Sequence, residues 1–234
     1  MAIKELSWHS SRQVKLQKKP SIKEIFAYRT EIDSWIEATL DWYEDSSDKT
    51  AQSRLDKCSA VMRALFGLDI YEGTVYRVVP EVKPFNKMVT ENTVLKFNVS
   101  EKRLLSSWTS SLSNAISFGN SNSYDYGSYI VIQLEDTKKV QQVASTEYTW
   151  LMVEYLRKTI RDWLRHDAPA LLEKSKNKSL AKGYIHDLKY LLPGLTGVTI
   201  KLDKFKKEDE IILKIQPGVK VRVVAIVNSG RRIR

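Results

Sequence analysis

Two glutamates one residue apart, Glu208 and Glu210, have the clearest capacity for chemistry in this sequence. They follow a lysine-rich stretch, and Glu210 begins the apolar run EIILKI, which is typical of a β-strand. Residues two apart in an extended strand project to the same side, so both carboxylates would meet at one place. Carboxylates that close can shift each other's pKa values, which suits acid–base catalysis. Such a glutamate pair more commonly marks only the solvated end of a strand. Other residues must therefore decide whether Glu208 and Glu210 form a catalytic site.

An arginine and two hydroxyls occupy comparable positions in earlier predicted strands. Arg77 falls in the middle of TVYRVVP, on the same side as Val75 and Val79. A guanidinium between apolar neighbours needs an anionic partner, unless it lies at a solvated sheet edge. Ser107 and Thr109 alternate in LLSSWTSS, just before a predicted helix, where a simple helix cap would also explain them.

Several familiar kinds of site are missing from the sequence. There is no Walker loop, no G-x-G-x-x-G after a strand and no nucleophile elbow. The single cysteine, Cys58, falls on the apolar stripe of a predicted helix and is interpreted as a core residue. The histidines, His9, His166 and His186, are far apart in the chain, so we expect no metal site.

The composition points to a folded, basic protein. Of 234 residues, 38 are Lys or Arg and 28 are Asp or Glu, for a formal charge of +10. Such a charge attracts polyanions, including nucleic acid and the proteins bound to it. The N-terminal stretch lacks the apolar core of a secretion signal, and no run reaches the ~18 apolar residues of a membrane span. We therefore expect a soluble cytoplasmic protein that does not enter a membrane.

The elements that must position these residues follow from periodicity. Apolar spacing predicts helices over 21–43, where Ser21 and Glu24 form a capping box, and over about 55–67. Further helices are predicted at 110–118, 145–164 and 168–192. Alternating or β-branched runs predict strands at 73–80, 94–99, 104–108, 129–134, 197–202, 210–215 and 219–227.

A strand arginine, then Ser-x-Thr at a strand end, then Glu-x-Glu entering a late strand resembles the Arg-Ser-Glu class of mono-ADP-ribosyltransferases. This class includes binary actin-modifying toxins, arginine-modifying ectoenzymes and small transferases of tailed phages. The resemblance covers about residues 73 to 227, and it depends on the order and strand context of three short motifs.

The resemblance implies that NAD is the donor substrate. Arg77, with its neighbour Val78, would bind the NAD phosphates, and Ser107 would brace the active-site strands and the catalytic glutamate. Thr109 takes the third position of the serine motif. Phe118 matches an aromatic residue that packs near the nicotinamide in toxin relatives.

The same resemblance assigns Glu210 as the catalytic glutamate and Glu208 as the residue that receives the target side chain. Phe205 matches the aromatic residue of the loop that presents the substrate. A carboxylate that holds the ribose 2′-hydroxyl stabilises the oxocarbenium-like centre left by nicotinamide, as glycosidase carboxylates do. A second carboxylate can orient a guanidinium and take its proton, and Glu at the first position goes with arginine as acceptor in relatives.

Three departures from the family pattern are visible. The interval between Ser107 and Glu208 is long, because it contains a predicted helical insertion at about 146–192 that would act as a recognition lobe or a lid. Trp108 stands where many relatives have threonine. No second arginine follows Phe118 closely, so the second phosphate contact is unassigned.

The sequence thus predicts an α+β chain with the ADP-ribosyltransferase fold, in which two packed mixed or antiparallel sheets surround an NAD cleft. Residues 1–72 would form a helical segment packed on a catalytic core of residues 73–234, as one domain overall. The predicted activity is transfer of ADP-ribose from NAD to arginine on proteins, with release of nicotinamide.

The charge suggests a protein target that is acidic or associated with nucleic acid. RNA polymerase or translation components would suit, as for phage members that act on host proteins in the host cytoplasm. Two alternatives stay open: a nucleic-acid-binding module without catalysis, whose lysines contact phosphate and whose aromatic residues stack on bases, and an NAD glycohydrolase with water as acceptor.

Overall fold

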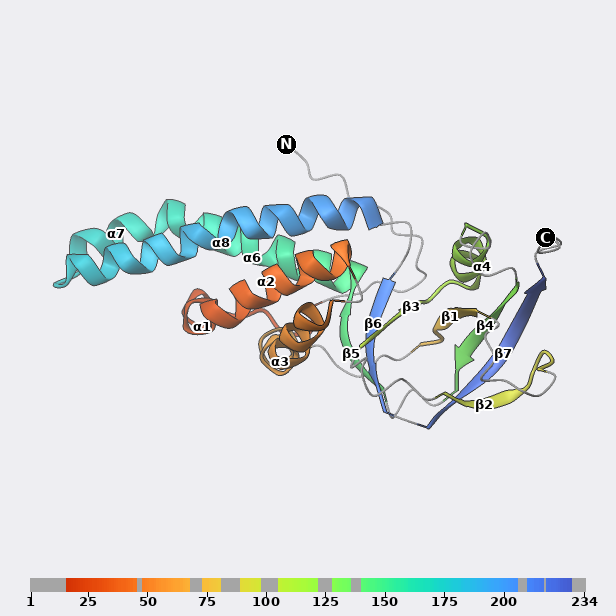
Figure 1. Cartoon of the computed structure of the whole chain (residues 1–234). Helices are drawn as coiled ribbons and strands as arrows, with labels where there is room; N and C mark the ends of the chain where they lie inside the picture. The colour runs from red at the N-terminus through yellow and green to blue at the C-terminus, as the bar shows by residue number, and fades with distance from the viewer. Residues whose placement is uncertain are drawn as a thin grey trace.

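The chain is an α+β protein with its helices gathered at one side of an antiparallel sheet. The computed structural model describes residues 16–45, 48–67, 73–80, 89–97, 105–121, 128–135, 140–205, 210–216 and 218–228. Within these ranges it contains seven helices and seven strands. Most helices lie against the sheet edge formed by β5 and β6, and of the helices described only α4 lies apart from them, beside β1, β3 and β4 (Figure 1).

The N-terminal helices are α1 (Ile22–Ala27), α2 (Arg29–Glu44) and α3 (Lys49–Phe66). The predicted capping box is confirmed, because the Ser21 hydroxyl accepts the Glu24 N–H and the Glu24 carboxylate accepts the Ser21 N–H. The single helix predicted over 21–43 is wrong in one respect. Tyr28, at φ −109° and ψ 23°, leaves helical geometry and divides the segment into α1 and α2. The next helix ends at Gly67, in the left-handed conformation that glycine favours.

Seven strands make one sheet in the order β2-β7-β4-β1-β3-β6-β5, and every neighbouring pair is antiparallel. The strands are β1 (Tyr76–Pro80), β2 (Val94–Phe97), β3 (Ser106–Thr109), β4 (Ser128–Leu134), β5 (Val140–Ser145), β6 (Glu210–Ile215) and β7 (Val219–Asn228).

The expectation of two separate sheets is corrected by this topology, since hydrogen bonding joins all seven strands. The join between β1 and β3 is narrow: among the described residues it consists of the single pair Tyr76 and Thr109. On either side, β1 pairs with β4 over five residues and β3 pairs with β6 over four. The sheet therefore has a four-stranded half and a three-stranded half that meet at one residue pair.

The two halves curl toward each other. In a flat sheet β2 and β3 would be nearly 20 Å apart, about four strand spacings of ~4.8 Å. The rings of Phe97 on β2 and Trp108 on β3 are nevertheless in edge contact, with centroids 5.8 Å apart. Buried side chains from both halves, such as Ile132, Leu213 and Val221, fill the space inside the curl. The curl of the single sheet creates this inner core.

The second half of the chain supplies α6 (Thr146–His166), α7 (Ala168–Lys174) and α8 (Lys178–Phe205). The strand predicted over 197–202 is wrong, because these residues belong to α8. From residue 188 onward, five side chains of α8 are buried at alternating spacings of three and four residues, which is a helical stripe. They are Leu188, Leu191, Leu195, Val198 and Leu202. The free energy gained by burying this stripe outweighs the β-preference of Val198 and its neighbours. It also offsets the cost of Pro193 inside the helix.

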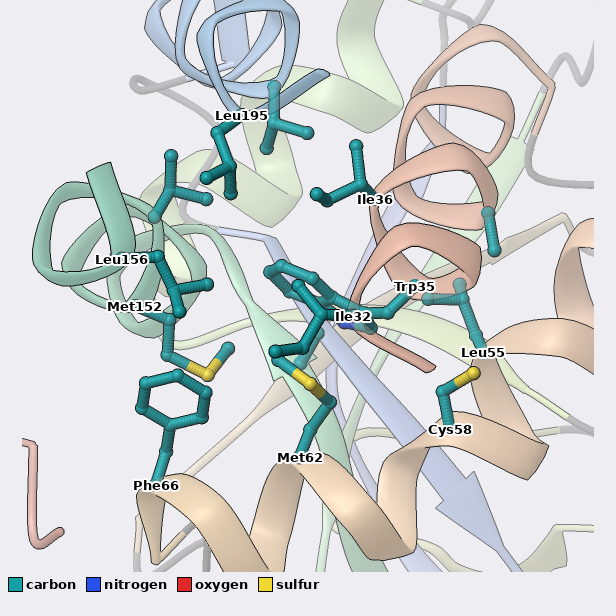
Figure 2. Packing of buried hydrophobic residues seen from close by; sticks show 14 of the residues in the cluster. Ile32, Trp35, Ile36, Leu55, Cys58, Met62, Phe66, Met152, Leu156 and Leu195 are labelled. Atoms are coloured by element: carbon teal, nitrogen blue, oxygen red, sulfur yellow. The ribbon is translucent and has the colours of Figure 1, made fainter. Parts of the chain in front are cut away.

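The main hydrophobic core lies between the helices and the outer face of the three-stranded half. Figure 2 shows Trp35 and Ile36 of α2 meeting Met62 of α3, Met152 of α6 and Leu195 of α8. Side chains of β5 and β6, including Val143 and Ile212, complete this core. The N-terminal helices and the helices after β5 thus share one core and together cover the three-stranded half of the sheet.

Cys58 is buried in the main core, as predicted, and burial raises the pKa of its thiol. His166 and His186 are exposed on α6 and α8. Strand β5 was missed, because VQQVAS lacks a clear alternating pattern, yet five of its six residues pair with β6. No helix in the described parts of the chain is long and apolar enough to cross a membrane.

Candidate active site

Arg77, Ser107 and Glu210 come from three neighbouring strands and form a hydrogen-bonded chain. The Ser107 hydroxyl donates to Oε1 of Glu210 at 2.5 Å. The Arg77 guanidinium donates to the backbone carbonyl oxygen of Ser107 at 2.6 Å. The three positions therefore come together as the sequence predicted, although 30 and 103 residues separate the partners. Their chemical roles stay predictions.

Strand register explains why Ser107 reaches Glu210. Thr109 pairs with Glu210 and Ser107 pairs with Ile212, so Ser107 and Glu210 are diagonal neighbours on one face of the sheet. The alternate residues of the same strands, such as Trp108, face the inner core. Ser107 and Glu210 consequently lie on the face turned toward the helices.

Arg77 lies on β1 at the narrow join between the two halves of the sheet. By strand alternation it shares a side with Val75 and Val79 of the inner core, opposite to the face that carries Ser107 and Glu210, and its side chain is partly buried. Its hydrogen bond to Ser107 spans β1 and β3 where, among the described residues, only Tyr76 and Thr109 pair. A side chain thus links the strands beyond the point where their backbone pairing stops.

Glu210 has a second donor that the sequence did not reveal. The indole N–H of Trp42, on α2, donates to the same Oε1 at 3.0 Å. The Thr146 hydroxyl, in the first turn of α6, donates to the backbone carbonyl oxygen of Glu210 at 3.1 Å. A buried indole N–H needs an acceptor, which was a signal available in the sequence, but nothing there indicates which acceptor it meets.

The carboxylate of Glu210 is held by one oxygen. Both side-chain hydrogen bonds end on Oε1, and none within the described ranges ends on Oε2. Glu210 is partly exposed, whereas Trp42 is buried with 2% of its surface accessible. Such an arrangement orients the carboxylate while leaving its second oxygen to accept a hydrogen bond from a bound hydroxyl.

The other predicted residues have different positions. Thr109 pairs with both Tyr76 and Glu210, and its hydroxyl accepts the N–H of Ser111 just before α4 (Leu112–Ser121). Val78 packs in the small core beneath α4. Phe118 lies on α4 with 57% of its surface exposed, outside the hydrogen-bonded chain.

Two predicted substrate residues lie wholly or partly outside the described residues. Glu208 lies outside the described residues. Phe205 is the last residue of α8, and its side chain also lies outside what the structure describes.

Charged side chains anchor the helices around this site. Lys214, on the same face of β6 as Glu210, pairs with Asp56 of α3 at 2.7 Å. Lys201 of α8 forms an ion pair with Glu44 and approaches the Leu40 carbonyl oxygen, both at the C-terminal end of α2. In the parts of the chain that are described, no three His, Cys, Asp or Glu side chains gather as metal ligands would.

Comparison of the chain with protein-family models, with curated proteins and with solved structures found no match.

Proposed function

We propose that this protein transfers ADP-ribose from NAD to arginine side chains of target proteins and releases nicotinamide. The observation that supports this most strongly is the hydrogen-bonded chain of Arg77, Ser107 and Glu210. The resemblance to Arg-Ser-Glu transferases assigns phosphate binding, support of the active-site strands and catalysis to these three residues. They are remote from one another in the sequence. A chance occurrence of the three motifs would not require them to meet.

Glu210 would hold the ribose of the donor. When the bond between nicotinamide and ribose breaks, positive charge develops on the sugar ring, and a fixed carboxylate stabilises it. Ser107 and Trp42 hold Oε1, so Oε2 is the oxygen that would accept the 2′-hydroxyl. Because the carboxylate is oriented in advance, little reorganisation is needed as the charge develops.

Arg77 would bind the phosphates of NAD. A guanidinium presents a planar fork of N–H donors that matches phosphate oxygens. Its contact with the Ser107 carbonyl oxygen places this fork beside the strand that carries the glutamate's hydroxyl partner. The phosphates and the ribose of NAD would then be bound by Arg77 and Glu210, which are linked through Ser107.

The ADP-ribosyltransferase fold belongs to this proposal as well. In this proposal the four-stranded and three-stranded halves of the one curled sheet, joined at one pair, would take the place of the two packed sheets of that fold. The proposed arginine specificity depends on Glu208, and it therefore rests on the Glu-x-Glu motif in the sequence.

The target would be acidic or associated with nucleic acid, as the charge of +10 suggests. Lys182, His186, Lys189 and Lys204 are exposed on α8, whose opposite face is buried in the main core. Tyr190, 66% exposed, lies beside Lys189. A basic surface of this kind would speed encounter with a polyanionic target, and the labelling rate would fall as salt is raised.

The test is incubation of the protein with labelled NAD and a cell lysate, with wild type and Glu210→Gln compared. We expect labelled proteins with wild type and at least ~100-fold less labelling with the variant, the cost typical of losing transition-state charge stabilisation. Glu135→Gln is the matched control, because the Glu135 carboxylate pairs with Arg222 elsewhere on the sheet. Equal labelling by wild type and Glu210→Gln would contradict the proposal.

Two additional measurements separate the alternatives. Addition of a small guanidine compound should give an ADP-ribosylated adduct, whereas a glycohydrolase would release only free ADP-ribose. Binding of RNA or DNA that weakens steeply with salt, without any consumption of NAD, would instead favour a nucleic-acid-binding module.

A further inference from the structure

Oε1 of Glu210 receives hydrogen bonds from two different layers of the molecule. Ser107 belongs to the sheet, whereas Trp42 belongs to α2 in the helical layer. A serine hydroxyl can rotate and can donate or accept, but an indole N–H can only donate and its direction is fixed by the ring. Trp42 therefore restricts the carboxylate more strictly than Ser107 does.

The position of Trp42 is itself well determined. Its side chain is buried in the main core together with Trp35, which lies seven residues earlier on the same face of α2. The end of α2 is attached to α8 through the contacts of Lys201 with the Leu40 carbonyl oxygen and with Glu44. The indole is thus a rigid donor that cannot follow a moving carboxylate.

We propose that Trp42 is a positioning residue for Glu210, which keeps Oε1 engaged so that Oε2 faces the donor substrate. This inference depends on the proposed function, because it assigns Glu210 the role of holding the ribose. It also makes the helices before β1 part of the working site, in addition to their place in the core. The Arg-Ser-Glu motifs contain no residue from this part of the chain.

The structure offers a matched pair of variants. Trp35 and Trp42 lie on one helix, are 1% and 2% exposed and share one core. The Trp42 N–H donates to Glu210, whereas the Trp35 N–H has no hydrogen-bond partner in the described parts of the chain. Replacement of either by phenylalanine removes similar packing, but only Trp42→Phe removes a donor from the carboxylate.

We expect Trp42→Phe to lower kcat for NAD consumption by about 10- to 100-fold, the usual cost of losing a residue that orients a functional group, while KM for NAD changes little. Trp35→Phe should leave kcat per folded molecule near that of wild type. Equal kcat values for the two variants would overturn the inference. If the wild type consumes no NAD, the proposed function fails, which is a different result.

A second measurement does not depend on turnover. The indole ¹H–¹⁵N resonances of Trp42 and Trp35 can be assigned from the two phenylalanine variants, or from single-site labelling if a variant does not fold. In Glu210→Gln the Trp42 resonance should shift, since its acceptor loses its charge, and the Trp35 resonance should stay in place. An unchanged Trp42 resonance would overturn the inference whether or not the protein is active.

Discussion

The hydroxyl of Ser107 donates to Oε1 of Glu210 at 2.5 Å across 103 residues of chain. The contact exists because β3 and β6 are neighbours in a register that makes the two residues diagonal on one face. Between the two residues, the described parts of the chain form α4, the strands β4 and β5 of the same sheet, and the long helices, before β6 pairs with β3. The contact between a serine and a glutamate is therefore a product of the topology.

Ser107→Ala tests that contact directly. Loss of the hydroxyl leaves Oε1 of Glu210 with one donor, so we expect kcat for NAD consumption to fall by about 10- to 100-fold. Steady-state nicotinamide release, together with a thermal unfolding curve, is the measurement.

Ser106→Ala is the matched control for Ser107→Ala. Ser106 lies on the opposite face of β3, where its hydroxyl accepts the Trp108 indole N–H at 2.9 Å. Loss of the Ser106 hydroxyl leaves the buried Trp108 N–H without an acceptor. This should lower the free energy of unfolding by about 1 to 3 kcal/mol, while activity per folded molecule is unchanged. If Ser106→Ala lowered kcat and Ser107→Ala lowered only stability, the proposed role of Ser107 at Glu210 would be contradicted.

Arg77→Lys tests the predicted phosphate contact. Lysine keeps the charge but loses the planar fork, so we expect KM for NAD to rise by about 10-fold with a smaller change in kcat. Arg222→Lys is the comparison, because Arg222 pairs with Glu135 near the surface of the same half of the sheet. If both variants retain the KM of wild type, Arg77 does not bind the donor.

Gly194→Ala tests the close approach of α8 to α2. A Cβ at position 194 would lie 2.9 Å from Cγ2 of Ile36, a buried and branched side chain with little freedom to move. We expect the free energy of unfolding to fall by about 1 to 3 kcal/mol. This loss exceeds the stabilisation that alanine gains over glycine through its higher helix propensity.

Gly183→Ala is the control within the same helix. Nothing lies within 4 Å of a Cβ at position 183, so the substitution should raise stability by up to ~1 kcal/mol. Chemical denaturation of both variants gives the comparison, and a stabilising Gly194→Ala would show that the helices can separate without cost.

Asp33 provides a prediction for pH. Burial, with a contribution from Glu37 one turn along α2, raises the pKa of the Asp33 carboxyl above its ordinary value. The folded state therefore holds its proton to a higher pH than the unfolded state, and ionised Asp33 lowers stability at neutral pH. Asp33→Asn should stabilise the protein at pH 7.

The stabilisation from Asp33→Asn should shrink as the pH falls through the raised pKa and vanish below the unfolded value of about 3.9, where both states are protonated. Unfolding free energies of wild type and variant across this range measure the effect. A benefit that stayed constant with pH would mean that the charge of Asp33 is not its source.

Local interactions explain what was predictable from the sequence. The capping box at Ser21 and Glu24 and the glycine end at Gly67 involve residues three or four apart, which the chain order states directly. The strands that carry Arg77 and Glu210 were recognisable as short β-branched or apolar runs, and their motifs indicated which polar residues to consider, whose chemical roles stay predictions. The fold class and the candidate residues were thus available from periodicity and order.

Only the tertiary structure decided the features that depend on partners distant in the chain. Val198 and its neighbours are helical because α8 buries a stripe against α2 and α6, and the missed strand β5 is held by β6. The single curled sheet and the indole of Trp42 at Glu210 likewise depend on which elements meet. Burial and hydrogen bonding between remote segments outweigh local preference, because their free energy is gained only when the whole chain packs.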